Sequence, residues 1–199
     1  ALDPAEAAAL QRQLAQIRPL ADQIMNDLAQ IGQAAARQLG LDEPFALQGT
    51  EHRVKSFESL ARKLEDEGVL SGDPESFLAR TNDIVRFSLK LPDGAGYTQG
   101  VTQVLTELSD RGYQLVDAKN FWRPGNRFFG MNYTFESPQG QTFELQFHTD
   151  ASWRANKLTH AAYEVLRRED ELPPRRVHAL LQTLAINKQV GLSESIPPG

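Results

Sequence analysis

The sequence predicts an α+β fold: a mixed β-sheet of about five strands, flanked by helices and preceded by an N-terminal helical segment. Several short stretches alternate apolar and polar residues with a period of two, which is typical of strands with one buried face. Longer stretches between them repeat apolar residues every three to four positions, which is typical of amphipathic helices. Glycine and proline residues separate the two kinds of stretch, as turns require.

The first forty residues predict a helical segment that packs on the rest of the chain. Asp3 can cap a helix and Pro4 fits its first turn, whereas Gly40 ends the pattern. Pro19 lies inside the pattern, so we expect one bent helix or a pair of helices. The apolar stripe consists of Leu10, Leu14, Ile17, Ala21, Ile24, Leu28 and Ile31.

Residues 41–188 then predict one domain of alternating strands and helices, followed by a flexible tail at 189–199. A loop is expected over 41–50, and a tight turn at 138–140 joins the last two strands into a hairpin. The predicted strands are 52–55, 83–91, 113–121, 130–136 and 142–148. The predicted helices are 57–67 with Ser56 as cap, 75–80, one between the turn at 93–96 and Gly112, 150–168 and 175–188.

Composition restricts the classes of partner and the compartment. The 199 residues carry a net charge of −5, which argues against broad binding of nucleic acid. There is no apolar run of 18 residues and no signal peptide, so we expect no membrane span. Cysteine is absent, which excludes disulfides and thiol chemistry. The chain begins without methionine, as a domain excised from a longer protein or a cloning choice would.

The most informative strand runs from Thr142 to Thr149. Its large apolar residues share one face, which suits a core, whereas Glu144, Gln146 and His148 share the other. Successive side chains on such a face are about 6.6 Å apart. A carboxylate, an amide and an imidazole in one row can hold a metal or take a proton from a hydroxyl. The alternative is the solvated face of an amphipathic strand.

A local cluster of basic residues stands out in this acidic chain. Arg53, Lys55, Arg62 and Lys63 fall within eleven positions. Arg53 and Lys55 are two apart on a predicted strand, and Ser59 and Lys63 are four apart on the following helix, so each pair shares a face. Helix N–H groups, hydroxyls and cations together can bind a chain of phosphates. A solvated helix face is the simpler alternative.

A second carboxylate completes the candidate site. Asp83 begins a predicted strand, and Arg86 follows three residues later. Together with Glu144, Asp83 supplies two carboxylates from separate strands beside a cationic segment. Such a set fits Mg²⁺-assisted transfer of a phosphoryl or pyrophosphoryl group.

These segments, in this order, resemble the synthetase domain of RelA/SpoT-type alarmone enzymes over about residues 50–168. The run R-x-K-S-x-x-S-x-x-x-K from Arg53 is similar to the family's ATP-phosphate segment, and Asp83 to its Mg²⁺ aspartate. The run E-L-Q-F-H-T from Glu144 is similar to the strand that carries the catalytic glutamate. The run F-F-G-M-N from Phe128 stands where the family has Tyr-Arg-Ser-Leu-His or a close variant. The resemblance implies a nucleotidyltransferase-like synthetase fold.

The resemblance also implies an activity, namely transfer of the β,γ-pyrophosphate of ATP to a ribose 3′-hydroxyl with Mg²⁺ as cofactor. It further implies the residue roles. On the donor side, the ATP phosphates would be bound by Arg53, Lys55, Ser59 and Lys63, and Arg86 is the candidate for the arginine that stacks on adenine. Asp83 and Glu144 would hold Mg²⁺, and Glu144 would also orient or deprotonate the hydroxyl. On the acceptor side, Phe128 would stack on the base, and Asn132 and Gln146 would lie near the acceptor.

Where the chain departs from the family pattern, it resembles a divergent branch of the family that occurs as toxin domains in interbacterial and prophage systems. The family's D-x-x-G-x-R is shortened to D-x-x-R at Asp83, the stacking tyrosine is replaced by Phe128, and the helix from Ser152 to Tyr163 is similar to that branch. The branch includes a type VI secretion effector that converts ADP and ATP to (p)ppApp. This implies ADP or ATP as acceptor, action in the cytoplasm of a target cell after secretion within a larger effector, and a cognate immunity protein.

Rival interpretations stay open. The chain could be a (p)ppGpp synthetase that uses GDP or GTP, an enzyme that modifies the 3′ end of tRNA, or an inactive module that binds nucleotides or a partner. The net acidity disfavours tRNA, and the retained carboxylates and basic residues disfavour inactivity. Phe128 could be a core residue, Asn132 and Gln146 could only tie strands together, and His148 is expected to be structural or on the surface rather than catalytic.

Overall fold

The computed structural model describes residues 2–66, 74–124, 126–166, 168, 171–192 and 196–198. The described elements are, in order, α1 (Pro4–Gln38), β1 (Ala46–Gln48), the 3₁₀ turn η1 (Thr50–His52), α2 (Phe57–Asp66), α3 (Pro74–Arg80), β2 (Arg86–Lys90), α4 (Ala95–Asp110), β3 (Gln114–Asn120), β4 (Met131–Glu136), β5 (Thr142–His148), α5 (Asp150–Leu166) and α6 (Pro173–Gln189). Within the described ranges no helix is long and apolar enough to cross a bilayer.

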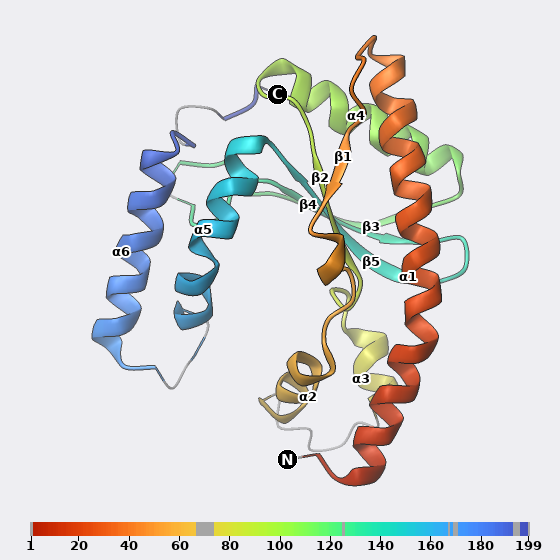
Figure 1. Cartoon of the computed structure of the whole chain (residues 1–199), viewed down its shortest axis with the longest axis vertical. Helices are drawn as coiled ribbons and strands as arrows, with labels where there is room; N and C mark the ends of the chain where they lie inside the picture. The colour runs from red at the N-terminus through yellow and green to blue at the C-terminus, as the bar shows by residue number, and fades with distance from the viewer. Residues whose placement is uncertain are drawn as a thin grey trace.

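The strands form one sheet in the order β1-β2-β5-β4-β3. β2 and β5 are parallel, and the other neighbouring strands are antiparallel. In Figure 1, α1 runs along one side of the sheet, and α5 and α6 stand together on the opposite side. The predicted α+β fold with a five-stranded mixed sheet is therefore confirmed.

Helix α1 is continuous through Pro19, so of the two expected alternatives the single helix is correct and the pair of helices is not. Pro19 has no N–H to donate to the carbonyl of Ala15, its usual helical partner. Both residues are exposed, so water can donate a hydrogen bond to that carbonyl instead. Asp3 caps the helix as predicted, in a capping box with Glu6. The seven predicted stripe residues are all buried in the core.

The chain between α1 and α2 differs from the expectation. The short strand lies at Ala46–Gln48, inside the predicted loop, where it pairs antiparallel with β2 at the edge of the sheet. Residues 52–55 make only one bridge, between Val54 and Val85. Gly49, with φ of +62°, turns the chain into η1 and ends the edge strand there.

Two further predictions need correction near the C-terminus. From its sequence, α5 is expected to draw much of its apolar surface from Trp153, Leu158, Ala161, Ala162 and Val165. Its buried face instead consists of small residues, Ser152, Ala155, Thr159 and Ala162, whereas Leu158 and Ala161 are exposed. Small residues suffice because α5 packs along α6, which presents Ala179 and Thr183 on its own buried side.

The described part of the predicted flexible tail packs on the domain. Leu192 is only 1% exposed, and Val190 and Ile196 also contact the core. Thr98 Oγ1 donates a hydrogen bond to the carbonyl of Pro198 at 2.5 Å. The remainder of the predicted tail, residues 193–195 and 199, lies outside the described residues.

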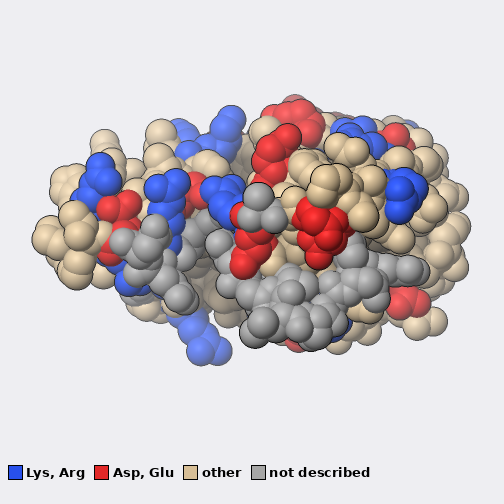
Figure 2. Space-filling model, turned by 90° about the horizontal axis from the view of Figure 1, so that it is seen from below, with Lys and Arg blue, Asp and Glu red and all other residues tan. Residues whose placement is uncertain are grey.

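The sheet has one apolar and one polar face. Its apolar face contributes Phe87, Leu89, Tyr133, Phe135, Phe143, Leu145 and Phe147 to a core shared with α1 and α4. The opposite face is lined by the polar residues that alternate with these. Figure 2, which views the end of the molecule that carries α2, shows lysine and arginine interspersed with aspartate and glutamate. The described residues at this end therefore form no broad basic surface of the kind that general nucleic-acid binding needs.

Candidate active site

Glu144 lies in the middle of the polar face, half-buried. Its Cα pairs with Arg86 on one neighbouring strand and with Thr134 on the other. Directly paired residues of adjacent strands project from the same face of a sheet. The parallel β2 thus brings Arg86 beside Glu144, and the antiparallel β4 brings Asn132 beside Gln146.

A chain of hydrogen bonds runs along β5 from Glu144 into α5. Gln146 Nε2 donates to Glu144 Oε1 at 2.8 Å. Gln146 Oε1 lies 3.1 Å from His148 Nε2, and His148 Nδ1 lies 2.9 Å from Ser152 Oγ. Gln146 therefore bonds within its own strand, which disagrees with the alternative that its amide ties strands together.

His148 is fully buried, which excludes the surface alternative and agrees with the structural one. Burial lowers the pKa of the imidazole to about 4, because the charged ring would lose its hydration. The ring is neutral at physiological pH and carries a single N–H.

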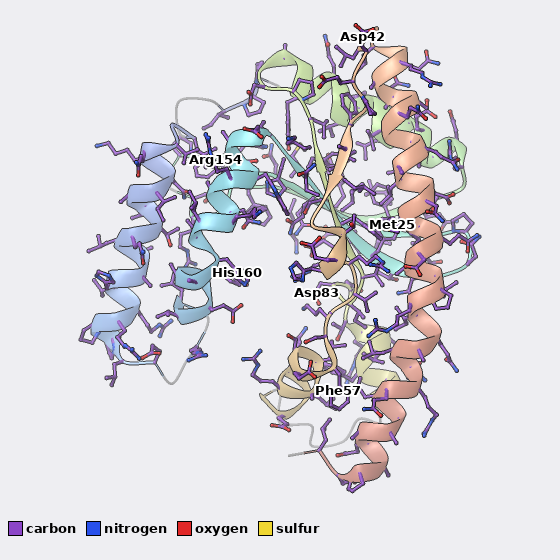
Figure 3. The ribbon with its side chains drawn as sticks, viewed as in Figure 1. Met25, Asp42, Phe57, Asp83, Arg154 and His160 are labelled. Atoms are coloured by element: carbon purple, nitrogen blue, oxygen red, sulfur yellow. The ribbon has the colours of Figure 1, made fainter. Side chains whose placement is uncertain are left out.

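The cationic segment meets Asp83 in front of β2. Lys55 Nζ forms an ion pair and hydrogen bond with Asp83 Oδ2, and Lys63 Nζ lies 3.9 Å from Asp83 Oδ1. In Figure 3, Asp83 lies between the sheet and α2, which begins at Phe57. Asp83 itself stands in a turn, because β2 begins only at Arg86.

The charges around Asp83 shift its ionisation. Burial acts to raise the pKa of this carboxyl, but the hydrogen bond from Lys55 and the charges of Lys55, Lys63 and Arg86 outweigh it and hold the pKa below its usual value. Burial lowers the pKa of Lys55, although Asp83 opposes this. Asp83 is therefore a carboxylate at neutral pH, surrounded by three cations.

Helix α2 presents its first turns to this cluster. Ser56 caps the helix, since its Oγ accepts a hydrogen bond from the Ser59 N–H at 3.2 Å. Ser59 and Lys63 share one half-buried face, whereas Arg62 is exposed on another. This placement agrees with the predicted helix and its predicted face.

Arg53 is not brought into the cluster. Its Nε donates to Asp22 Oδ1 at 2.8 Å, and its Nη1 donates to the carbonyl of Thr50 at 3.0 Å. The prediction that Arg53 and Lys55 face one side is wrong, because the segment is not a strand. Asp22, on α1, had no signal in the sequence, because a polar residue beside an apolar stripe is common on any amphipathic helix.

Phe128 contacts this site through the ring of His148. The two ring centroids are 5.4 Å apart at an interplanar angle of 89°, and Phe121 contacts Phe128 at 5.4 Å and 81°. Phe128 is half-buried and lies outside the hydrophobic core cluster, which disagrees with the alternative that it is simply a core residue. Edge-to-face contacts on two sides fix the orientation of the ring.

Asp83 and Glu144 suit Mg²⁺, which needs few protein ligands, better than they suit a metal ion whose ligands all come from the protein. Among the described residues no cluster of three or more acidic, histidine or cysteine side chains could hold a metal. Mg²⁺ typically binds one or two carboxylates, with waters and substrate phosphates completing its shell. Asp83 and Glu144 supply carboxylates of that kind.

Comparison with known proteins places this fold among alarmone synthetases. No family model and no curated protein matches the sequence. Similar solved structures include small alarmone synthetase 1 from Bacillus subtilis bound to its product pppGpp, with a TM-score of 0.61 and 14% identity over 94% of this chain and 95% of that one. A GTP pyrophosphokinase family protein from Streptococcus pneumoniae has a TM-score of 0.61 and 16% identity over 91% and 89%.

A third similar structure is the type VI effector Tas1 in complex with its immunity protein. Its TM-score is 0.50, with 16% identity over 94% of this chain and 95% of that one. At such identities the likeness establishes the fold. The resemblance to the RelA/SpoT-type synthetase domain, including its toxin branch, is confirmed at that level.

Proposed function

We propose that the protein is a nucleotide pyrophosphokinase that transfers the β,γ-pyrophosphate of ATP to the 3′-hydroxyl of an adenosine nucleotide. One observation carries the proposal. On a fold shared with alarmone synthetases, the half-buried carboxylate of Glu144 stands beside Arg86, and the ion-paired cluster of Lys55, Lys63 and Asp83 lies at the start of β2.

The basic side binds the donor. Lys55, Lys63 and the Ser59 hydroxyl, with the N–H groups at the start of α2, contact the ATP phosphates. Arg86 stacks on the adenine of ATP. Arg53 is occupied by Asp22 and the Thr50 carbonyl, so we assign it to anchoring this segment on α1 rather than to phosphate binding.

Glu144 serves the acceptor. The 3′-oxygen attacks the β-phosphorus of ATP, the bond from that phosphorus to the α,β-bridging oxygen breaks, and AMP leaves. Glu144 Oε2 takes the proton of the 3′-hydroxyl, since Oε1 is held by Gln146. Asp83 and Glu144 would hold Mg²⁺, which neutralises charge on the transferred phosphates.

The acceptor base stacks on Phe128, with Asn132 beside it. Recognition of guanine needs acceptors for its N1–H and exocyclic amine. The small cavity beside Phe128 is lined by Ser152 and Asn156 and by no carboxylate of the described residues. An amide such as Asn156 pairs with N6–H and N7 of adenine. These features support ADP and ATP, hence (p)ppApp, over GDP and GTP.

The rival acceptor has support of its own, because the Bacillus subtilis neighbour is bound to pppGpp. A competition assay with equal ADP and GDP, together with Mg-ATP, separates the two. We expect (p)ppApp as the main product by mass spectrometry. A mixture dominated by ppGpp would overturn the adenine assignment and leave the pyrophosphokinase activity in place.

Toxicity and an immunity partner follow from the same chemistry. An enzyme that consumes ADP and ATP without a matching hydrolase depletes them, and the neighbour Tas1 is seen with an immunity protein. We assign the protein to the cytoplasm of a target cell, after secretion in a larger effector. Expression in a bacterial cytoplasm should arrest growth for wild type and not for Glu144→Ala; equal growth of both would refute the toxin role.

The central test of the activity is Glu144→Ala. Removing one preorganised electrostatic contact costs about 3 kcal/mol, so we expect a loss of turnover of at least about a hundredfold. The fold should persist, because the side chain projects from the polar face, and circular dichroism checks this. Turnover within tenfold of wild type would remove Glu144 from the mechanism. If wild type shows no metal-dependent consumption of ATP with any nucleotide, the alternative of a binding module holds.

A further inference from the structure

The hydrogen bonds from Glu144 to Ser152 have one consistent direction. The Glu144 carboxylate accepts only, so the amide of Gln146 must turn its Nε2 toward it and its Oε1 toward His148. That oxygen accepts only as well, so His148 must carry its proton on Nε2. Nδ1 is then an acceptor, and the hydroxyl of Ser152 donates to it at 2.9 Å, the shorter of its two contacts with acceptors, since the Thr149 carbonyl lies at 3.3 Å.

The far end of this chain is anchored by the backbone. The Ser152 Oγ accepts a hydrogen bond from the Thr149 N–H at 2.9 Å, and the Ser152 N–H donates to Thr149 Oγ1 at 3.1 Å, which caps the start of α5. Ser152 is therefore fixed, and it holds the plane of the His148 ring, whose tautomer is set by Gln146. The ring also contacts Phe128 and Trp153 edge-on, at 5.4 Å and 5.6 Å.

We propose that His148 is a positioning residue for pyrophosphoryl transfer, because its Nε2–H orients the Gln146 amide that holds Glu144, while its ring supports Phe128. The role rests on the proposed function. It connects the helix cap of α5 to the carboxylate that takes the proton and to the ring on which the acceptor base stacks. Glu144 Oε1 is thereby occupied, and Oε2, which makes no hydrogen bond within the described ranges, is left for the 3′-hydroxyl.

Two substitutions of similar polarity separate positioning from simple packing. In His148→Gln, the amide nitrogen reaches the place of Nε2 and can still donate to Gln146. In His148→Asn, the shorter side chain reaches only the place of Nδ1, so the link to Gln146 is lost. Both remove the aromatic ring, and any effect of the ring alone is therefore common to the pair.

We expect kcat to be about tenfold or more lower in His148→Asn than in His148→Gln. A factor of this size is typical for the loss of one hydrogen bond, here the bond to the Gln146 amide that holds the Glu144 carboxylate. The KM for ATP should stay the same in both, because Lys55 and Lys63 bind the donor. The KM for the acceptor should rise in both, because Phe128 loses its support.

A readout without catalysis uses the ¹⁵N resonances of the imidazole rings. His52, His160 and His178 are exposed, and His148 alone of the four histidines is buried. Its ring should show a protonated Nε2 and an unprotonated Nδ1 in wild type. In Ser152→Ala this tautomer should persist, because Gln146 Oε1 still accepts from the Nε2–H.

The outcomes distinguish the two levels of the proposal. A proton on Nδ1 of His148 overturns the positioning role, whatever the activity. An active wild type with equal kcat in the Asn and Gln variants overturns the positioning role alone. A wild type that transfers pyrophosphate to no nucleotide overturns the proposed function, and the positioning role with it. The expected tautomer together with the kcat difference supports both.

Discussion

The buried imidazole of His148 should make the stability of the protein depend on pH between about 4 and 6.5. The pKa of the ring falls to about 4 in the folded protein, against an ordinary value of 6.5. Above pH 6.5 the ring is neutral in both states and costs nothing. As the pH falls below 6.5 the unfolded chain binds a proton that the folded chain does not, so stability decreases until about pH 4.

The magnitude follows from the difference between these pKa values. The two pKa values differ by about 2.5, and at about 1.4 kcal/mol per pH unit this corresponds to about 3.5 kcal/mol in total, of which about 2 kcal/mol is lost between pH 8 and pH 5. Such a loss is a large part of the stability of a typical domain. It is measurable as a shift of the urea midpoint at constant m-value.

The assay compares wild type with His148→Gln by urea unfolding at several pH values from 8 to 5. The variant cannot bind the proton, so its stability should fall by about 2 kcal/mol less than that of wild type over this range. His160→Gln is the matched control, because His160 lies exposed on α5, and it should follow wild type. If wild type and His148→Gln lose equal stability over this range, the buried neutral imidazole is wrong.

Two further predictions concern the phosphate side and the packing of α1. Lys55→Ala and Lys63→Ala should each raise the KM for ATP and slow turnover, because each removes a cation from the cluster around Asp83. Arg62→Ala, on the exposed face of α2, should change the steady-state kinetics little. If Arg62→Ala instead has the larger effect, the phosphates bind to the face of α2 that carries Arg62. Gly32→Ala should lower the thermal midpoint of unfolding, because a Cβ there would lie 2.3 Å from the carbonyl oxygen of Phe45, in the segment before β1. Gln33→Ala, on the exposed side of α1, is the control and should be neutral or slightly stabilising. Equal midpoints for the two variants would show that the segment moves to make room for the added methyl group.

Most of the fold could be predicted because the periodicity of a segment reports how it is buried. The stripe of α1 and the alternation of β5 each identify the face that packs in the core. Where packing does not depend on large apolar residues, this signal fails. Helix α5 buries Ala155 and Thr159 against α6 and leaves Leu158 exposed, which inverts the expectation from hydrophobicity.

The candidate site was predictable by residue type but not by orientation. Lys55, Lys63 and Asp83 meet as the order of the segments indicates, yet Arg53 turns to α1, because its partner Asp22 comes from a distant part of the chain. Burial of a polar residue is equally invisible in one strand. Whether His148 faces water or protein depends on α5 and Phe128, which cover it in three dimensions.

The parallel pairing of β2 with β5 brings the region of Asp83 and that of Glu144 to the same end of the sheet, as a shared substrate would require. Among the strands that the structure describes, β2 and β5 are the only neighbours that run in the same direction. Both therefore begin at the same end of the sheet. Asp83 precedes β2 by three residues, and Glu144 is level with Arg86, the first residue of that strand. An antiparallel β5 could instead bring Glu144 level with Lys90, about 13 Å farther along the sheet. Glu144 would then lie away from the cluster of Lys55, Lys63 and Asp83, so the proposed site depends on the crossover through α4, β3 and β4 that makes β5 parallel to β2.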